Sequence, residues 1–398
     1  MERQRQATDR RGHFWKALKE KPLKVGVDAR LLCLPPTGIG RYAAELCNHL
    51  CHREVEVFCY LPGPLSSAYA LDKRIKVRAG RGVGELPKIL WSQTLLPDWA
   101  ARDAVDVLWG TSHRLPFRLQ ATIRRVVTIH DMVWRKYPQT MRRSTLWAER
   151  IFMPPAVRSA DRVIADSHST AADLRSAFPR CADKIRIVYP GAGVEHHGNT
   201  ADFDHLAELG ISRPFFLFVG TLEPRKNLER LIAAYALVPR ELRKEAQMVI
   251  VGGQGWGGLQ LSRWIGLNDL TDDVVSTGYV TDVQLTQLYA SARFLAMPSL
   301  YEGFGFPVLE AMACGTPALI SGVSSLPEVG GDAVVVVDPL DEASIAKGLI
   351  DLLTGPRRDE LVLRSKTQAR RFSWDKAAAE VEAVFYEALQ ERTHSRQQ

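Results

Sequence analysis

Two glutamates lie eight positions apart in the stretch SLYEGFGFPVLEAMACGTP, residues 299–317. Glu302 precedes a glycine- and aromatic-rich turn, and Glu310 follows it inside a predicted helix whose first position suits Pro307. Four residues of the turn offer backbone N–H groups at the helix start: Gly303, Phe304, Gly305 and Phe306. Such amides bind anions, and carboxylates accept hydrogen bonds from hydroxyls, so the stretch fits a ligand with both phosphate and sugar hydroxyls. The alternative is that Glu310 complements the helix dipole and Glu302 is a solvated loop charge.

Two adjacent cations follow a predicted buried strand in FVGTLEPRKNLERLI, residues 218–232. The strand is expected to end at Gly220, which leaves Arg225 and Lys226 between the strand and the next helix. Open α/β sheets bind ligands at the carboxyl ends of their strands. A planar guanidinium beside a compact ammonium suits a diphosphate there, whereas the alternative is a solvated helix start.

Two further features lie in the N-terminal half of the chain. In PPTGIGRYAAEL, residues 35–46, Gly38 and Gly40 would let the backbone approach a ligand at the start of a helix. In VVTIHDMVW, residues 126–134, His130 ends a predicted strand, either facing a cleft or serving as a structural histidine. Neither feature identifies a reaction by itself.

A glycine pattern in GGQGWGG, residues 252–258, formally matches a dinucleotide-binding fingerprint. A functional fingerprint follows the first strand of its unit, opens a helix, and has an acidic residue at the end of the next strand. Here the next strand, VVSTG, ends without a carboxylate. The pattern therefore does not indicate an NAD site.

The chain of 398 residues, 46% hydrophobic and 24% charged, is long enough for two sizeable domains. Short apolar strands alternate with helical stretches, which favours parallel sheets. The alternation stops in a Gly-, His-, Asn- and Asp-rich segment, residues 187–213, and then resumes. We expect an α/β fold of two facing, doubly wound Rossmann-like domains with a cleft between them. The expected segments are a basic N-terminal extension (1–23), a first domain (24–195), a second domain (205–372) and a C-terminal helix (373–398) that packs back toward the first domain.

Composition also limits the partners. The formal net charge of +7 at pH 7 suggests an anionic partner. The six cysteines form no CxxC pair and no Cys/His spacing typical of a metal site, which fits a reduced cytosolic protein. No run approaches the roughly 20 apolar residues of a membrane span, and the charged start has no apolar signal core. We therefore expect a cytoplasmic protein.

Two basic and aromatic segments could lie on an anionic membrane surface: GHFWKALKEKPLK, residues 12–24, and WRKYPQTMRRSTLWAERIF, residues 134–152. The first places Phe14 and Leu18 one helical turn apart. The alternatives are a disordered tail and a solvated helix face. No nucleic-acid module is recognisable, so nucleic acid is not an expected partner.

Taken together, these motifs resemble the retaining glycosyltransferases of family 4, which have the GT-B fold of two facing Rossmann-like domains. The resemblance covers residues 24–390 and rests on four motifs in the family's order: TGIGRY, TIHD, the G-x-x-x-P-R-K-N run from Gly220 to Asn227, and the pair of glutamates separated by seven residues. FVGTLEPRKNLERLIAAYALVP and VTIHDMVW further resemble the bacterial mannosyltransferase branch that builds O-antigen and exopolysaccharide chains.

The resemblance implies roles for the residues singled out above. The implied catalytic residues are His130, Arg225, Lys226 and Glu302. The implied donor-binding residues are Gly38, Gly40, Gly220, Arg225, Lys226, Gly303, Phe304, Gly305, Phe306 and Glu310. The cations and turn amides would neutralise the donor diphosphate, Glu310 would hold the ribose, and Glu302 and His130 would hold the transferred sugar. No metal or other cofactor is expected, because no D-x-D-type run lies beside a strand end in the donor domain.

The resemblance also implies the substrates. GDP-mannose is the favoured donor, with GDP-rhamnose, dTDP-rhamnose or a UDP-sugar as alternatives. The acceptor would be a lipid-linked or polysaccharide chain, reached in the cytoplasm or peripherally at the inner face of the membrane. A GT-B epimerase or hydrolase would instead release nucleotide without an acceptor. A catalytically idle binding subunit is the alternative from another class, and the joint presence of Arg225, Lys226, Glu302 and Glu310 argues against it.

Overall fold

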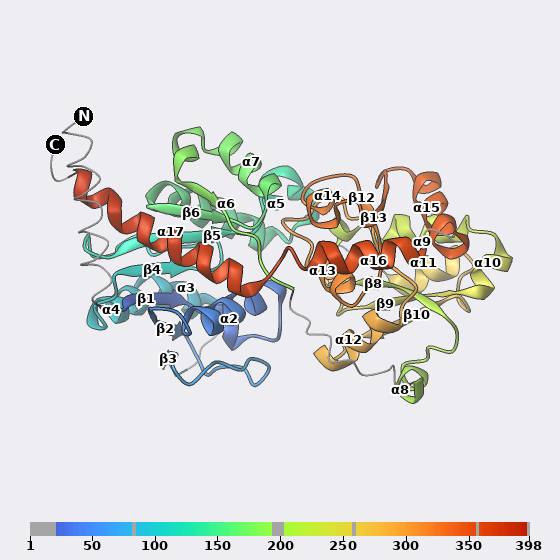
Figure 1. Cartoon of the computed structure of the whole chain (residues 1–398), viewed down its shortest axis with the longest axis horizontal. Coiled ribbons are helices and arrows are strands. Elements are labelled where there is room, and N and C mark those ends of the chain that lie inside the picture. The colour runs from blue at the N-terminus through green and yellow to red at the C-terminus, as the bar shows by residue number, and fades with distance from the viewer. Residues whose placement is uncertain (1–20, 82–84, 193–202, 257–259, 356–357, 396–398) are drawn as a thin grey trace.

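The computed structural model describes residues 21–81, 85–192, 203–256, 260–355 and 358–395. Two α/β domains lie end to end, the N-terminal one on the left of Figure 1 and the C-terminal one on the right. Most of the basic N-terminal extension, with Phe14 and Leu18, lies outside the described residues, as does the centre of the segment between the domains.

The N-terminal domain contains a parallel seven-stranded sheet in the order β3-β2-β1-β4-β5-β6-β7. Its strands are β1 (Leu23–Asp28), β2 (Val55–Leu61), β3 (Lys76–Ala79), β4 (Val107–Gly110), β5 (Arg124–Ile129), β6 (Arg162–Ala165) and β7 (Ile185–Ile187). Its helices are η1 (Arg30–Cys33), α2 (Gly38–Leu50), α3 (Glu85–Gln93), α4 (Leu95–Arg102), α5 (Val133–Lys136), η2 (Pro138–Thr140), α6 (Arg143–Ser159), α7 (His168–Ala177) and η3 (Pro179–Lys184).

The C-terminal domain contains a parallel six-stranded sheet in the order β10-β9-β8-β11-β12-β13. Its strands are β8 (Phe215–Val219), β9 (Gln247–Val251), β10 (Val274–Gly278), β11 (Leu295–Met297), β12 (Ala318–Ser321) and β13 (Val334–Val337). Its helices are α8 (Phe203–Glu208), η4 (Pro224–Lys226), α9 (Leu228–Ala236), α10 (Arg240–Glu245), α11 (Leu261–Leu267), α12 (Asp282–Ser291), α13 (Phe306–Ala313), α14 (Leu326–Gly330), α15 (Glu342–Thr354) and α16 (Arg358–Ala369).

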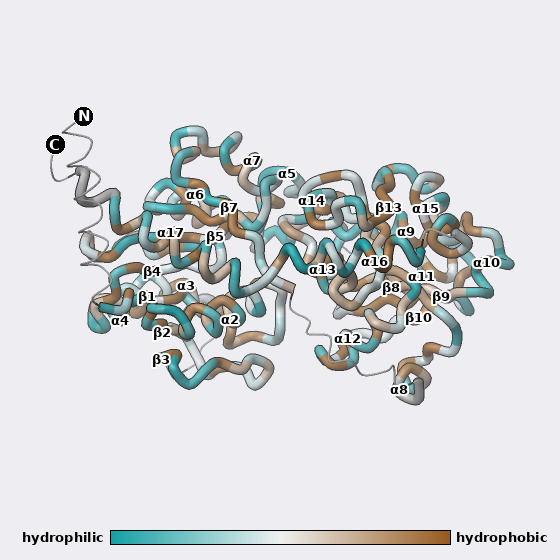
Figure 2. The backbone as a smooth tube through the Cα atoms, viewed as in Figure 1, coloured by the Kyte–Doolittle hydropathy of each residue, from teal (hydrophilic) through white to brown (hydrophobic). Residues whose placement is uncertain are grey.

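The predicted pair of parallel, doubly wound sheets is therefore confirmed. The strand order reverses beside β1 in one sheet and beside β8 in the other, and such switch points form ligand crevices at the carboxyl ends of the strands. All residues of β8 and β9 are buried, as expected for strands that helices cover on both faces. In Figure 2, segments of hydrophobic residues accordingly lie at the centre of each domain, and hydrophilic residues lie on the outer helices.

The last helix, α17 (Trp374–Ser395), crosses from the C-terminal domain and packs on the N-terminal one (Figure 1). Ser373 precedes it, and its hydroxyl accepts a hydrogen bond from the Lys376 N–H at 3.2 Å. Phe385, on the buried face of α17, meets the ring of Trp109 on β4 at a centroid distance of 5.7 Å. The chain therefore passes between the domains twice, and its final segment completes the core of the first domain.

None of the helices that the structure describes combines the length and the low polarity needed to cross a membrane. All six cysteines are free thiols, and five of them are buried.

We expect Phe385→Ala to lower the free energy of unfolding of the N-terminal domain by about 3–5 kcal/mol, because it leaves a cavity beside Trp109. Urea unfolding followed by tryptophan fluorescence measures the change. Leu363→Ala on α16 is the control, since this side chain is 71% exposed and its loss should change stability by less than about 0.5 kcal/mol. Equal effects of the two substitutions would contradict the assignment of α17 to this core.

Candidate active site

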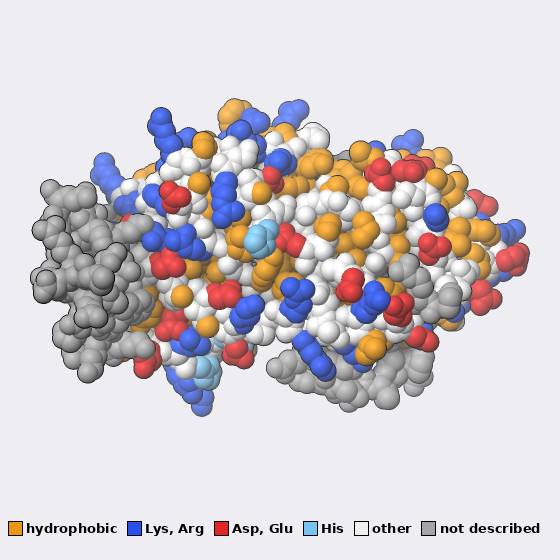
Figure 3. All heavy atoms as spheres, turned by 45° about the horizontal axis from the view of Figure 1, so that its top comes forward, with side chains coloured by type: hydrophobic (Ala, Val, Ile, Leu, Met, Phe, Trp, Pro, Cys, Tyr) orange, Lys and Arg blue, Asp and Glu red, His pale blue; other side chains and the backbone are white. Residues whose placement is uncertain are grey.

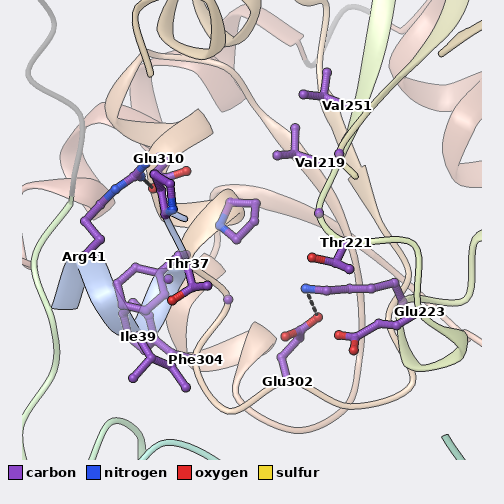
Figure 4. Close-up of a pocket in the computed structure, with 18 of the residues that line it drawn as sticks. Thr37, Ile39, Arg41, Val219, Thr221, Glu223, Val251, Glu302, Phe304 and Glu310 are labelled. Atoms are coloured by element: carbon purple, nitrogen blue, oxygen red, sulfur yellow. Dashed lines mark hydrogen bonds and ion pairs between the residues drawn. The ribbon is translucent and has the colours of Figure 1, made fainter. Parts of the chain in front are cut away.

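A pocket of about 390 Å³ lies between the two domains, at the carboxyl ends of strands from both sheets. This volume is within the range of small-molecule sites. Most of the residues singled out from the sequence line it: Gly38, His130, Gly220, Arg225, Lys226, Glu302, Gly303, Phe304, Gly305, Phe306 and Glu310. Figure 4 shows Arg41 and Glu310 facing each other at one end of the pocket, and Glu302, Glu223 and Thr221 grouped at the other.

Glu302 is held by the two cations of the loop that follows β8. One carboxylate oxygen accepts a hydrogen bond from Arg225 Nη1 at 2.6 Å, and the other accepts one from Lys226 Nζ at 2.8 Å, the dashed line in Figure 4. Arg225 also donates to the carbonyl oxygen of Tyr301 at 2.8 Å and forms an ion pair with Glu223. Two cations and two carboxylates therefore balance one another in a largely buried cluster.

This charge balance shifts the pKa values of the cluster. Burial alone would raise the pKa of Glu302, but the charges of Arg225 and Lys226 outweigh it and hold the pKa at about 2. Burial alone would lower the pKa of Arg225, but Glu302 and Glu223 outweigh it and raise that pKa. Glu302 is thus an anion and Arg225 a cation at neutral pH.

The loop that carries the two cations is fixed by Asn227. Its φ of 60° lies in the left-handed region, which asparagine tolerates better than most residues. Its side-chain amide donates to the carbonyl oxygens of Pro298 at 2.9 Å and Pro339 at 2.7 Å, beyond the ends of β11 and β13. The cations are therefore anchored to the loops of two other strands.

The turn between the two glutamates keeps its amides available. Helix α13 begins at Phe306, one residue earlier than predicted, and Gly305 caps it with a φ of 104°, which favours glycine. The N–H groups of Gly303, Phe304 and Gly305 have no hydrogen-bond partner among the residues that the structure describes, and all three residues line the pocket. Free amides at a helix start attract anions, in agreement with the sequence interpretation.

Glu310 is engaged from the opposite domain. Its Oε1 accepts a hydrogen bond from Arg41 Nη1 at 2.6 Å, and its Oε2 accepts one from the Tyr289 hydroxyl at 3.0 Å. Arg41 lies on α2 and also reaches Asp282 at 2.7 Å, so its side chain spans the cleft. Burial raises the pKa of Glu310, and Arg41 and Tyr289 offset this only in part. A ligand hydroxyl at Glu310 must share or replace the contact with Arg41.

His130 follows β5 and lines the pocket, but both of its ring nitrogens already have partners. Nδ1 pairs with the Asp166 carboxylate, and Nε2 lies 2.8 Å from the carbonyl oxygen of Thr111. The ring of Tyr42 meets the imidazole edge-on, with the centroids 4.8 Å apart. A sugar contact through the ring of His130 would therefore need an exchange of one of these hydrogen bonds.

The three predicted glycines lie in different surroundings. Gly38 and Gly220 line the pocket, whereas Gly40 is absent from its described lining. The N–H of Gly40 donates to the Thr37 hydroxyl at 3.0 Å, and a side chain at this position would collide with the hydroxyl of Tyr69. The structure thus gives Gly40 a part in helix capping and packing, and its expected approach to the ligand stays a prediction.

Direct hydrogen bonds join the two domains beside the pocket. The Ser167 hydroxyl donates to the carbonyl oxygen of Gly303 at 2.6 Å. The Glu328 carboxylate of the C-terminal domain accepts the backbone N–H groups of His168 at 2.9 Å and Ser169 at 3.0 Å, at the start of α7. These contacts bring His130 and Glu302, from different domains, into one pocket.

The structure also brings polar residues outside the predicted set to the site, among them Arg41, Asp166, Glu223, Asp282 and Tyr289. Arg41 lies within the TGIGRY motif. Asp166 lies at the end of the predicted strand DRVIADS, just as His130 lies at the end of the predicted strand in VVTIHDMVW. The positions of Arg41 and Asp166 could therefore have been suspected from the sequence. Asp282 and Tyr289 carry no such signal, because their role depends on the packing of α12 against α13.

Three potential metal ligands also meet away from the pocket. Ligand atoms of Cys51, His52 and Asp72 lie within 4.8 Å of one another, although the cysteine spacing did not predict such a group. Arg74 is already present there, with Nη1 2.6 Å from His52 Nδ1. None of these residues lines the pocket.

Known proteins resemble this chain in both sequence and fold. Residues 36–196 match the family described as Glycosyltransferase Family 4, and residues 205–372 match Glycosyl transferases group 1. The O-antigen chain mannosyltransferase B of Escherichia coli is 31% identical over 360 residues, which cover 86% of this chain and 93% of that protein.

Among solved structures, sucrose-phosphate synthase from Thermosynechococcus elongatus has a TM-score of 0.75 at 20% identity, covering 93% of this chain and 100% of that one. WaaG, a glycosyltransferase involved in lipopolysaccharide biosynthesis, has a TM-score of 0.71 at 17% identity, covering 91% of this chain and 99% of that one.

Two facing Rossmann-like domains with a polar pocket between them define the GT-B class of glycosyltransferases. The chain belongs to glycosyltransferase family 4. The predicted fold class, family and enzyme class are confirmed.

We expect the stability that Glu302 contributes to disappear in acid. Its folded-state pKa of about 2 lies below the ordinary glutamate value, so the contribution is present above about pH 5 and is lost as the pH falls toward 2. The difference in unfolding free energy between wild type and Glu302→Gln should shrink by about 2 kcal/mol between pH 5 and pH 3. Urea unfolding at each pH measures it.

Glu310→Gln is the matched control, because the pKa of Glu310 is raised instead. The folded protein then takes up this proton at higher pH than the unfolded chain, so wild type should gain stability relative to Glu310→Gln as the pH falls. The same pH trend for both variants would contradict the charge assignment of the cluster.

Proposed function

We propose that this enzyme transfers mannose, with retention of anomeric configuration, from GDP-mannose to a hydroxyl of a bacterial surface glycan. The similarity to the O-antigen chain mannosyltransferase B of Escherichia coli supports the sugar and the class of glycan. One observation carries the proposal. The cations Arg225 and Lys226, the free amides of the turn, and the carboxylates Glu302 and Glu310 converge in a single pocket between the domains.

In this proposal the donor diphosphate lies beside Arg225, Lys226 and the free amides of the turn. Without the donor, Glu302 is the anionic partner of the two cations, and the bound diphosphate would take over part of that role. Glu302 then shares its cations with the ligand and keeps lone pairs for the hydroxyls of mannose. The two cations and the amides act without a metal ion, and we propose that none is required.

At the other end of the pocket, Glu310 accepts hydrogen bonds from the ribose and Asp282 reads the base. Guanine presents two adjacent N–H donors on one edge, N1–H and N2–H, which a carboxylate can accept together. Asp282 lies beside Glu310, since Arg41 contacts both carboxylates at 2.7 and 2.6 Å. Neither uracil nor adenine has this pair of donors, so the position of Asp282 favours a guanine nucleotide.

The proposed reaction breaks the bond between the anomeric carbon of mannose and the phosphate oxygen, and the electron pair stays on GDP. The acceptor hydroxyl oxygen attacks the anomeric carbon from the same face, and its proton passes to the departing phosphate oxygen. Arg225 and Lys226 meet the negative charge that develops on the leaving group. Glu302 has both oxygens in ion pairs with these cations and serves as a sugar ligand instead of a nucleophile.

We expect GDP and GDP-mannose to stabilise the protein selectively against thermal unfolding in a comparison with UDP, ADP and dTDP. A ligand at 100 times its Kd adds about 2.7 kcal/mol to the folded state, a readily measured shift. GDP release should also require an acceptor glycan. Stabilisation by another nucleotide would refute GDP-mannose as donor, and GDP release without acceptor would indicate a hydrolase.

Arg225→Ala should remove the GDP-induced stabilisation and lower turnover by about 10²–10³-fold, since it deletes a donor to the leaving group. Arg240→Ala is the control, because Arg240 is exposed at the start of α10 in the same domain and does not line the pocket. Near-normal turnover of Arg225→Ala, with the control unchanged, would refute the proposed role.

We propose that the acceptor, a lipid-linked or polysaccharide chain, is met at the inner face of the cytoplasmic membrane. Trp147 and Ile151 lie one turn apart on α6 and are 61% and 53% exposed. Phe117, 52% exposed, stacks on Phe152 of the same helix with the ring centroids 5.8 Å apart. Arg150 covers the ring of Trp147 at 5.7 Å from its centroid. Lys and Arg side chains are spread over the N-terminal domain in Figure 3. Exposed aromatic and aliphatic groups among cations suit an anionic lipid surface.

The double substitution Trp147→Ala/Ile151→Ala should weaken binding to phosphatidylglycerol vesicles about tenfold or more, because it removes apolar surface that would enter the lipid. GDP-induced stabilisation should stay unchanged. Leu267→Ala, on α11 of the C-terminal domain and 70% exposed, is the control. Vesicle co-sedimentation measures the effect, and equal binding by the two variants would refute the proposed membrane face.

A further inference from the structure

One carboxylate in the pocket has an oxygen without a partner. Asp166 follows β6, lines the pocket and is 1% exposed. Its Oδ2 pairs with Nδ1 of His130. Its Oδ1 is shielded from water and has no hydrogen-bond partner within the described part of the chain. Buried carboxylate oxygens normally accept hydrogen bonds, so this atom needs an explanation.

The neighbouring polar groups do not supply the missing bond. Both ring nitrogens of His130 already have partners, Nδ1 with Asp166 and Nε2 with the carbonyl oxygen of Thr111 at 2.8 Å. The hydroxyl of Tyr42 shares a hydrogen bond with the Thr128 hydroxyl at 3.3 Å. Asp166 nevertheless lies close enough for its charge to help raise the pKa of Tyr42, after the larger effect of burial. Oδ1 is therefore buried among protein atoms, and none of the described residues donates a hydrogen bond to it.

The two residues next to Asp166, one in sequence and one in space, contact the turn that follows Glu302. The next residue, Ser167, donates its hydroxyl to the carbonyl oxygen of Gly303 at 2.6 Å. The partner of Asp166, His130, has its own carbonyl oxygen packed so closely on Gly303 that a side chain there would collide with it. Asp166 and Glu302 therefore line the same pocket from the two sides of this junction between the domains.

We infer that Asp166 is a sugar-binding residue, whose Oδ1 accepts a hydrogen bond from one hydroxyl of the transferred hexose while Oδ2 holds His130 in place. The inference rests on the proposed function, since it names a further contact for the sugar of the donor. The hexose would then be held by one carboxylate from each domain, Glu302 and Asp166. Such a sugar can be gripped fully only when the two domains meet.

The test compares Asp166→Asn with wild type on GDP-mannose and on its four monodeoxyfluoro analogues, each of which lacks one sugar hydroxyl. The asparagine keeps the shape but replaces a charged acceptor, so kcat/KM for GDP-mannose should fall about 10- to 100-fold. With the one analogue that lacks the bound hydroxyl, the same substitution should cost less than about threefold, because the contact is already gone. Affinity for GDP alone should not change.

Asp161→Asn is the matched control, because Asp161 lies at the opposite end of β6, pairs with Arg124 at 3.1 Å and does not line the pocket. Should Asp166→Asn fail to fold by circular dichroism, Asp166→Ser takes its place with the same expected pattern. An equal loss of kcat/KM with GDP-mannose and all four analogues, at unchanged affinity for GDP, would show a merely structural role of Asp166. That result would overturn this inference and leave the proposed function standing. Failure of wild type to bind GDP would overturn the proposed donor and the inference with it.

Discussion

The buried ion pairs between Glu302 and the cations Arg225 and Lys226 are the constraint on which the site depends. Removing such charges from water is costly unless partners compensate them at short range. Glu223 and Asn227 complete that compensation, one by charge and the other by tying the loop to neighbouring strand ends. The cations are thereby held in place beyond the carboxyl end of β8, where the negative charge of a ligand can pair with them.

The two glutamates of the turn show how one motif can supply different chemistry. Charges of the C-terminal domain lower the pKa of Glu302, whereas burial raises the pKa of Glu310 against the influence of Arg41. Between them, Gly305 turns the backbone so that amide hydrogens remain free at the start of α13. An anion site thus separates two carboxylates with distinct electrostatic surroundings, a distribution that suits the phosphates, ribose and sugar of a nucleotide-sugar.

Contacts between the domains belong to the site itself. Arg41 spans the cleft to Glu310, and Ser167 reaches the turn at Gly303. The helix α17 returns to the first domain and packs into its core, so the two domains are joined by the chain in two places. A ligand hydroxyl that binds Glu310 must share or replace the contact with Arg41, which couples ligand binding to the relative position of the domains.

The sequence by itself determined the parallel sheets and the loops that carry Glu302, Arg225, Lys226 and His130. Apolar strands buried on both faces, and polar residues placed at their ends, follow from local patterns along the chain. Only the tertiary structure decided that Arg41 meets Glu310, that both ring nitrogens of His130 are occupied, and that Gly40 packs on Tyr69. Asp282 and Tyr289 entered the site in the same way. These outcomes depend on contacts between segments far apart in the sequence, because the partner of a charged or small residue is set by the packing of domains and helices and not by its neighbours along the chain.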